Sequence, residues 1–324
     1  MPYFAGFQLK GNWGLSSEVE FPSPQMFKEA AANGASLLFT PTIALRDPLG
    51  SDEYAYVRFK LVSEGPEGFV LLTRPLSASM GEVRTILEQR YDDSKVVLSF
   101  AVSSFTEAYQ LLEEVNREPD AYELDVNLTC LLSGKGAVYA FELAKELSAT
   151  LARPLIVKFS AGSASLVDLK RIVVESGAAA VVITPNVVYR IGNHFFRLST
   201  PPLLSTPLLV GIAESLSELD VGVAYIVQYG RNNLLELMPL KLYDASYVLH
   251  WMRWKSSGRG RVSAVPLAWR SISRRLKVYA RRGAGFCPYG LIKREGFVEG
   301  CNYCGVCFEL NEPGLVELAA LLSP

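Results

Sequence analysis

The residues best suited to chemistry are four cysteines near the end of the chain. Cys301, Cys304 and Cys307 are spaced three residues apart, and Cys287 stands upstream, followed by a proline. Such a spacing gathers four thiolates around one small volume, as in iron–sulfur clusters held by a C-x2-C-x2-C run and a remote Cys-Pro. Zinc in a closed four-thiolate site is the main alternative, and a disulfide framework is a third. The spacing favours an iron–sulfur cluster, most simply 4Fe-4S, over zinc.

A second set of polar residues stands where apolar runs end. Lys158 follows Leu-Ile-Val, Asn127 follows Leu-Asp-Val, and Asn186 follows Ile-Thr-Pro. A lysine is rarely buried without a partner, so the Lys158 ammonium faces an anionic ligand or pairs with a carboxylate. Both asparagines can donate and accept hydrogen bonds, as recognition of a planar heterocycle requires, and either one could instead cap a loop.

Cys130 comes three residues after Asn127. A lone cysteine is most often an inert buried thiol, but this position also allows a role in nucleophilic attack or proton transfer. Thr40 and Thr42 follow another apolar run in the same way. These residues are therefore further candidates for the site.

The apolar runs that precede these residues indicate buried strands of a parallel sheet, because they are β-branched and nearly continuous. Helix-like segments alternate with them. Eight such runs predict a (β/α)8 barrel whose chemistry sits at the carboxyl ends of the strands, with an open doubly wound sheet as the alternative. The runs are Ala35–Thr40, Val96–Val102, Ala121–Leu128, Pro154–Phe159, Ala179–Thr184, Leu208–Ile212, Val223–Val227 and Ala245–Leu249.

Helix signals lie between these runs. Ser23-Pro24 opens one helix that stops at Asn33-Gly34, a second covers Thr106–Glu118, and a third, Ser165–Ser176, ends at Gly177. The Ser/Gly-rich segment Arg253–Arg261 is the predicted linker out of the barrel. We therefore predict a barrel over 1–252 and a basic tail over 253–324, helical up to about Arg282 and then cysteine-rich.

Composition fits a globular protein with a large core, since 49% of the 324 residues are apolar and 20% are charged. The sequence has no run of 18 apolar residues and no signal-like start. With its thiols clustered, the chain is expected to be cytoplasmic, with no membrane association.

Charge is unevenly distributed along the chain. From Arg253 to Arg294 there are twelve Lys and Arg and no Asp or Glu. This segment is either a balancing surface or dimer contact, or a docking face for an acidic electron-transfer protein. Nucleic acid is a weaker candidate, because no recognisable nucleic-acid fold accompanies the charge.

Four segments in register resemble the dihydroorotate dehydrogenases and the related dihydropyrimidine dehydrogenase domain. The resemblance covers about residues 30–252, most of the barrel. Residues 122–130 resemble the strand E-L-N-x-S-C-P-N, and residues 154–160 resemble P-x-x-V-K-L-S. Residues 34–42 and 175–186 are similar to G-A-G-x-V-V-T-K-T and to A-G-A-D followed by a strand-end Asn.

The resemblance implies an FMN-dependent oxidoreductase that acts on a C–C bond next to a carbonyl in a pyrimidine-like small molecule. Lys158 would hold the flavin N1/O2 edge, and Cys130 would exchange a proton with carbon. Asn127 and Asn186 would bind substrate or flavin carbonyls. The remaining flavin contacts would be Thr40, Thr42, Gly230 and Arg231.

An iron–sulfur cluster would then relay electrons to or from the flavin. The glycines that cradle the flavin phosphate in this family are replaced here by Tyr229-Gly230 and His250-Trp251. The alternative is therefore a barrel without FMN, catalytic or not, whose metal-stapled basic tail binds a protein or RNA. A dihydrouridine synthase-like role on tRNA lies between the two.

Overall fold

The structure is a computed structural model, and the residues it describes fall into stretches separated by gaps. They are residues 2–19, 24–45, 57–65, 68–73, 75, 78–161, 173–191, 194–199, 202–216, 218–219, 221–228, 238–244, 276–284, 292–298 and 316–320.

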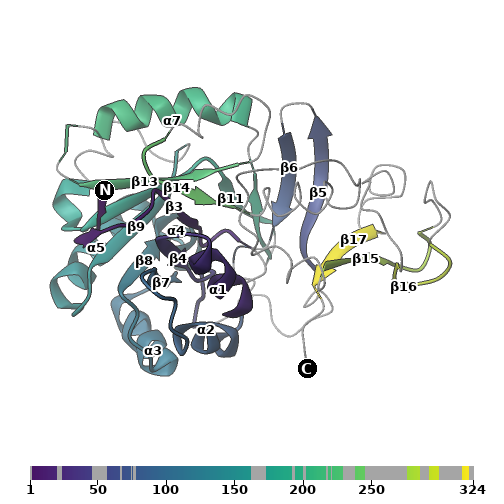
Figure 1. The fold of residues 1–324 in the computed structure, drawn as a ribbon, viewed down its shortest axis with the longest axis horizontal. Coiled ribbons are helices and arrows are strands. Elements are labelled where there is room, and N and C mark those ends of the chain that lie inside the picture. Colours follow the sequence, from purple (N-terminus) through teal and green to yellow (C-terminus); the bar gives the residue numbers. More distant parts are fainter. Residues whose placement is uncertain are drawn as a thin grey trace.

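Eight parallel strands close into a barrel, which confirms the predicted (β/α)8 architecture (Figure 1). Each strand pairs with its sequence neighbour in the barrel, and the last barrel strand pairs with the first. In chain order the strands are β3 (Trp13–Leu15), β4 (Leu37–Phe39), β7 (Lys95–Phe100), β8 (Ala121–Asp125), β9 (Leu155–Ser160), β10 (Ala180–Thr184), β13 (Gly222–Val227) and β14 (Lys241–Tyr243).

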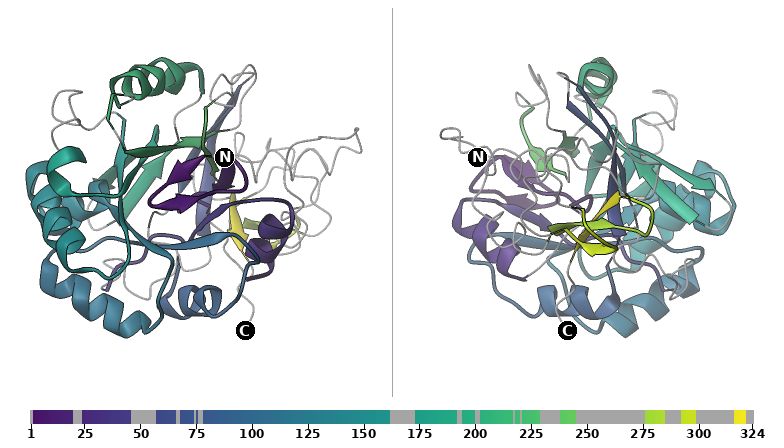
Figure 2. Two further views of the ribbon diagram at one scale, coloured as in Figure 1. Left: turned by 60° about the vertical axis from the view of Figure 1, so that its left-hand side comes forward. Right: turned by 90° about the vertical axis from the view of Figure 1, so that its right-hand side faces the viewer.

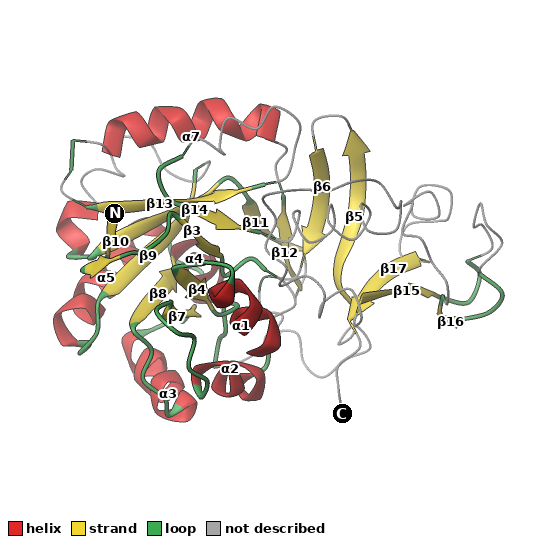
Figure 3. Ribbon diagram, viewed as in Figure 1, coloured by secondary structure: helices red, strands yellow, loops and turns green. Residues whose placement is uncertain are grey.

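Helices surround this barrel (Figures 2 and 3). The N-terminus of α2 has a capping box, in which Ser79 and Glu82 bond each other's backbone N–H groups. Asn116 ends α3 in the left-handed conformation. The helices outside the barrel are α1 (Pro24–Ala32), α2 (Met80–Leu87), α3 (Phe105–Val115), α5 (Ala137–Thr150) and α7 (Pro202–Leu216). The predicted helices at 24–33 and 106–118 are confirmed, and the third is helical over its described residues 173–176.

Two barrel strands were missed, and one predicted strand was wrong. Strands β3 and β14 were missed because each has only three residues, which is too short to form a recognisable apolar run. Leu208–Ile212 belongs to α7, since a short apolar run does not distinguish a buried strand from a buried helix. The predicted strand Ala245–Leu249 lies outside the described residues.

One predicted run divides into two elements. Ala121–Leu128 is a strand only as far as Asp125, after which α4 (Val126–Ser133) begins at once. Asp125 caps this helix, because its Oδ1 accepts a hydrogen bond of 3.0 Å from the Leu128 N–H. A carboxylate is thus fixed at the point where β8 ends.

Alternation along each strand separates the inside of the barrel from the helix layer. On β8, Tyr122 and Leu124 pack outward in the larger core, whereas Ala121 packs inside with Val97 and Ile156. Glu123 and Asp125 share the inward side with Ala121. The interior is therefore apolar near the start of the strands and charged near their ends.

The amino end of the barrel is filled by the N-terminal segment. Strands β1 (Tyr3–Phe4) and β2 (Phe7–Gln8) form a hairpin, and Phe4 and Leu9 are buried in the interior apolar cluster. Gly222, at the start of β13, lies against this hairpin, so an added Cβ would be 3.1 Å from Phe4. The hairpin forms an apolar floor beneath the charged layer.

A second sheet, here called the cap sheet, is antiparallel and lies beside the barrel (Figure 1). One of its hairpins follows β4 and another follows β10, so both leave the carboxyl ends of barrel strands. The sheet has the order β11 (Val187–Ile191), β12 (His194–Leu198), β6 (Gly68–Thr73), β5 (Val57–Gly65), β17 (Val316–Ala320), β15 (Leu276–Ala280) and β16 (Gly296–Phe297).

The described parts of the tail are strands. Leu276–Ala280 forms β15, so the expected helix up to Arg282 is wrong at these residues, where alternation of Leu, Val and Ala with Lys and Tyr favours a strand. Strand β17 pairs with β5 and joins the tail to the cap sheet. The four cysteines lie outside the described residues, so their metal site and the domain boundary at 252 stay predictions. Within the described stretches, no helix has the length and apolarity needed to span a membrane.

Gly14 is the position where the barrel tolerates no side chain. It pairs with Leu37 of β4, and an added Cβ would overlap the Leu37 carbonyl oxygen and come within 2.9 Å of its Cβ. We expect Gly14→Ala to lower the free energy of unfolding by about 1–3 kcal/mol, because backbone must shift. In α7, Gly211→Ala has open space and should be neutral or stabilising by up to about 1 kcal/mol. Urea unfolding of both variants measures the difference, and equal effects would contradict the close strand contact.

Candidate functional site

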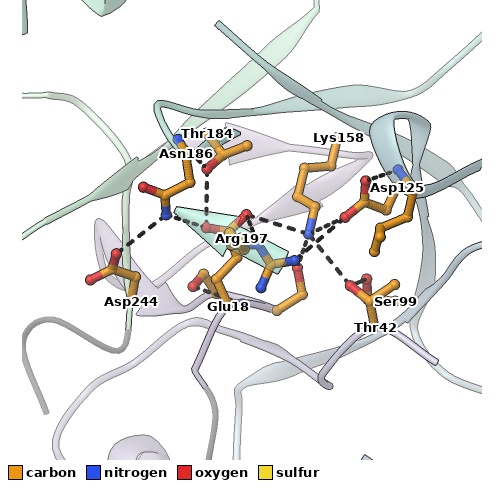
Figure 4. A network of polar contacts seen from close by, with 12 residues as sticks. Glu18, Thr42, Ser99, Asp125, Lys158, Thr184, Asn186, Arg197 and Asp244 are labelled. Carbon is orange, nitrogen blue, oxygen red and sulfur yellow. Dashed lines mark hydrogen bonds and ion pairs between the residues drawn. The ribbon is translucent and has the colours of Figure 1, made fainter. Parts of the chain in front are cut away.

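Charged side chains converge at the carboxyl ends of the barrel strands (Figure 4). We call this group the mouth cluster, and each of its members is at most 2% exposed. Its carboxylates and ammonium come from the barrel and the loop after β3, and its guanidinium comes from the cap sheet. The members are Glu18, Glu123, Asp125, Lys158 and Arg197.

Lys158 is the centre of the mouth cluster. Its Nζ lies 2.8 Å from Asp125 Oδ2 and 3.7 Å from both Glu18 Oε1 and Glu123 Oε1. It also donates to Ser17 Oγ at 2.7 Å. Burial by itself lowers the pKa of Lys158, but the carboxylates of Asp125, Glu123 and Glu18 outweigh it and leave the pKa above its ordinary value. Lys158 is therefore a fixed positive charge at neutral pH.

Glu123 lies beside Lys158 and behaves differently from Asp125. Its Oε1 accepts hydrogen bonds from the hydroxyls of Ser17 (2.6 Å) and Ser99 (2.7 Å). Its Oε2 is buried, with no hydrogen-bond partner among the described residues. Burial raises the pKa of Glu123, although Lys158 and the two hydroxyls oppose this. Burial thus favours the protonated form of Glu123, whereas Asp125 is the carboxylate in direct contact with the ammonium.

Arg197 brings the second positive charge from outside the barrel. It stands on β12, where it pairs with Thr73 of β6 on one side and with Val188 of β11 on the other. Its Nε lies 3.3 Å from Glu18 Oε1, and its NH2 lies 3.7 Å from Asp125 Oδ2. The cap sheet is thus joined to the barrel by a buried ionic contact.

Amide side chains extend the network to the other side of the mouth. Asn186 Nδ2 donates to Glu18 Oε2 at 2.5 Å and lies 3.5 Å from Asp244 Oδ2. Thr184 donates to the same Glu18 oxygen at 3.0 Å, and Gln228 Nε2 donates to Asn186 Oδ1. All of these side chains are buried, so the mouth is a continuous polar network.

Sequence analysis found part of this site. Lys158, Asn186 and Thr42 meet here as predicted, because Thr42 lies 3.4 Å from Lys158 Nζ and shares a 2.9 Å hydrogen bond with Ser99. Thr40 is linked to this group through Ser99, because the Ser99 N–H donates a hydrogen bond of 3.0 Å to Thr40 Oγ1. Gly230, Arg231 and the four cysteines lie outside the described residues.

Asn127 and Cys130 lie on α4 rather than on a strand. The buried Nδ2 of Asn127 has no hydrogen-bond partner among the described residues. Cys130 is half-buried, and burial, with a smaller effect of Asp125, raises the pKa of its thiol to about 11. At neutral pH this thiol is protonated. The catalytic and binding roles of these two residues stay predictions.

Most charged members of the mouth cluster were missed. Glu123 and Asp125 carried a readable signal, since two acids at alternate positions in an apolar strand must face the same side. Glu18 follows the strand that was itself missed. Arg197 lies in a hairpin whose sequence carries no motif that would mark a functional site. Among the described residues, no group of three or more His, Cys, Asp or Glu is arranged to hold a metal ion.

Comparisons with known proteins give a fold likeness and no family. No family description matches the chain, and no curated protein matches it. Among solved structures, a Burkholderia cenocepacia protein described provisionally as a phosphonomutase has 12% identity and a TM-score of 0.43, covering 76% of this chain and 91% of its own. An HpcH/HpaI aldolase from Desulfitobacterium hafniense has 9% identity and a TM-score of 0.38, covering 78% and 93%.

These comparisons correct the flavoprotein interpretation. Neither solved structure is described as a dihydroorotate dehydrogenase or as a CH–CH oxidoreductase. The predicted family, the FMN-dependent redox activity and the electron relay to a flavin are therefore wrong, and the partner-binding alternative gains no support. Likeness at such low identity and TM-score carries no activity to this chain. The function must be argued from the mouth cluster itself.

Glu123 gives the site a defined pH dependence. Its pKa in the folded chain lies above the ordinary value of 4.5, so the folded state keeps a proton that the unfolded state has released. Stability therefore falls as pH rises from the ordinary pKa through the raised one. Glutamine mimics the protonated acid, and we expect Glu123→Gln to gain stability relative to wild type as pH increases across this window. Urea unfolding at a series of pH values measures this gain. A difference that stays constant with pH would show that folding does not raise the pKa of Glu123.

The raised thiol pKa of Cys130 makes this cysteine unreactive in the native state. With a pKa of about 11, only on the order of one thiol in a thousand is ionised at pH 8, and the thiolate is the nucleophile. We expect iodoacetamide to label Cys130 far more slowly in the folded chain than in urea, as followed by peptide mass spectrometry. Labelling at the same rate in both states would contradict this environment.

Proposed function

We propose that the barrel is an enzyme that transfers a proton to or from a small polar substrate at its mouth. The observation that carries the proposal is the buried pair of Lys158 Nζ and Asp125 Oδ2, 2.8 Å apart at the ends of adjacent strands β9 and β8. Barrel enzymes place their catalytic groups at this face. Asp125 would take the proton, and Lys158 would stabilise the negative charge that develops on the substrate.

The energetics support a functional use of this pair. Removing several charges from water is expensive, and apolar residues of the same size are often as stabilising as a buried ion pair or more so. Clusters of buried charges with shifted pKa values are enriched at catalytic sites. Lys158 also donates a hydrogen bond to the Ser17 hydroxyl, and Asp125 caps α4, so both members of the ion pair are held in place.

The competing function is structural, with the mouth cluster holding the cap sheet on the barrel. It is favoured by one specific observation: Arg197 of β12 contacts the same Asp125 and Glu18 carboxylates. In that case the charges would affect stability alone. The two functions therefore differ in what a charge-neutralising substitution does to substrate turnover.

Three other expectations stay proposals beside this one. They are the four-cysteine metal site, a binding partner for the basic segment 253–294, and a cytoplasmic location, which rests on the clustered thiols. The catalytic proposal depends on none of them.

Asp125→Asn tests the proton-transfer role, because asparagine is also a good helix cap and keeps the local structure. We would incubate the full chain in deuterated water with amino acids, amines, keto acids and hydroxy acids, and follow loss of C–H signals by proton NMR. A substrate should exchange at a rate that falls about 10²–10⁴-fold in the variant. The exchange rate of the Lys158→Met variant should fall by a similar factor.

Asp120→Asn is the matched control at the opposite end of the same strand. Asp120 accepts from the Val96 N–H and pairs with Lys95 at 3.2 Å, far from the mouth cluster. Its variant should exchange at the wild-type rate. If Asp125→Asn keeps that rate, or if no compound exchanges while both mouth variants only lose stability, the structural function replaces the catalytic one.

A further inference from the structure

The mouth cluster is unbalanced in charge when the barrel is considered without its cap. The barrel strands and the loops that follow them contribute the carboxyl groups of Glu18, Glu123 and Asp125 and one ammonium, Lys158. Among the described residues, the second cation of the mouth cluster is Arg197, which comes from the cap sheet. The barrel alone therefore presents more carboxyl groups than cations at its mouth.

Arg197 compensates this charge as a bound ligand would. Its guanidinium is 2% exposed and lies between Glu18 and Asp125, the carboxylates that also flank Lys158 (Figure 4). It enters from a hairpin that belongs to a different sheet. A guanidinium is the cation that pairs best with planar carboxylates, so its position marks where these acids hold a cation.

A second observation points to a ligand at the same place. Glu123 Oε2, fully buried and in the same cluster, has no hydrogen-bond partner among the described residues. A buried polar atom is rarely left unsatisfied, and such an atom in a native site calls for a missing group. In its protonated form this carboxyl offers a hydrogen-bond donor beside Lys158, suited to an oxygen of the ligand.

We propose that the mouth binds a small substrate carrying a guanidinium or ammonium group, and that Arg197 occupies the place of this group in the closed chain. The proposal rests on the proton-transfer function and names its substrate class. The cation would contact Glu18 and Asp125 after Arg197 withdraws with β12. An anionic substrate fits less well, because it would meet these same carboxylates at close range in a desolvated site.

Chemical rescue of Arg197→Ala tests this proposal without any turnover assay. Removal of the guanidinium leaves buried carboxylates uncompensated, and the melting temperature should fall by roughly 5–10 °C. Millimolar guanidinium or methylguanidinium chloride, far below denaturing concentrations, should restore at least half of that loss in a saturable manner. Sodium chloride and sodium acetate at equal ionic strength should not.

The matched control is Arg153→Ala, which removes an exposed arginine that pairs with Glu118 at 3.1 Å. Its melting temperature should change little and should not respond to guanidinium. If Arg197→Ala does not fold, Arg197→Gln replaces it, with soluble yield in the presence and absence of methylguanidinium as the second readout. The proposal is overturned if acetate rescues as well as guanidinium, or if neither variant responds saturably to a cation.

The two proposals can fail separately. Rescue by guanidinium together with no C–H exchange by any compound would leave the cation site standing and remove the catalytic function. Exchange confined to keto acids or hydroxy acids, together with no rescue, would keep the catalytic function and remove the cation site.

Discussion

The Lys158 ammonium and the carboxylates around it govern how the two sheets of this protein meet. Its charge is kept in an interior with no exposure by Asp125 at 2.8 Å and by Glu18 at 3.7 Å. At these distances, and away from water, each charge depends on its neighbours far more than a surface pair does. The same carboxylates then hold Arg197 of the cap sheet, so one interaction organises the barrel mouth and attaches the second sheet.

Much of the barrel could be predicted from the sequence because its strands are buried on both faces. Such strands appear as apolar runs, and six of the eight predicted runs overlap strands of the barrel. Strands β3 and β14 escaped because each has only three residues, and in β3 the close approach to Leu37 also requires a glycine. Leu208–Ile212 was misassigned because a helix with apolar residues on most sides has the same local pattern. The cap sheet was unreadable, since its strands are brought together from segments far apart in the chain.

The site was predictable where a residue's place followed from its own strand. Lys158 and Asn186 were found because each follows an apolar run, and strand ends of a barrel meet on one face. Their partners were not found. Glu18 depends on the missed strand β3, and Arg197 depends on pairing between β12 and β6 that no local signal reveals. Cys130 attracted attention by its type, but the helix that begins at Val126 carries it away from the strand end.

The cap sheet also has a consequence for the order in which the chain is synthesised. Its strands come from residues as far apart as Val57 and Ala320, whereas the carboxylates Glu18, Glu123 and Asp125 all precede Arg197. On the ribosome these acids and Lys158 emerge before their guanidinium partner, and the sheet that supports that partner is complete only when the last strand has emerged. Arg197 in turn precedes the barrel strands β13 and β14, so the barrel mouth and its guanidinium partner are completed together, after both of these strands have emerged.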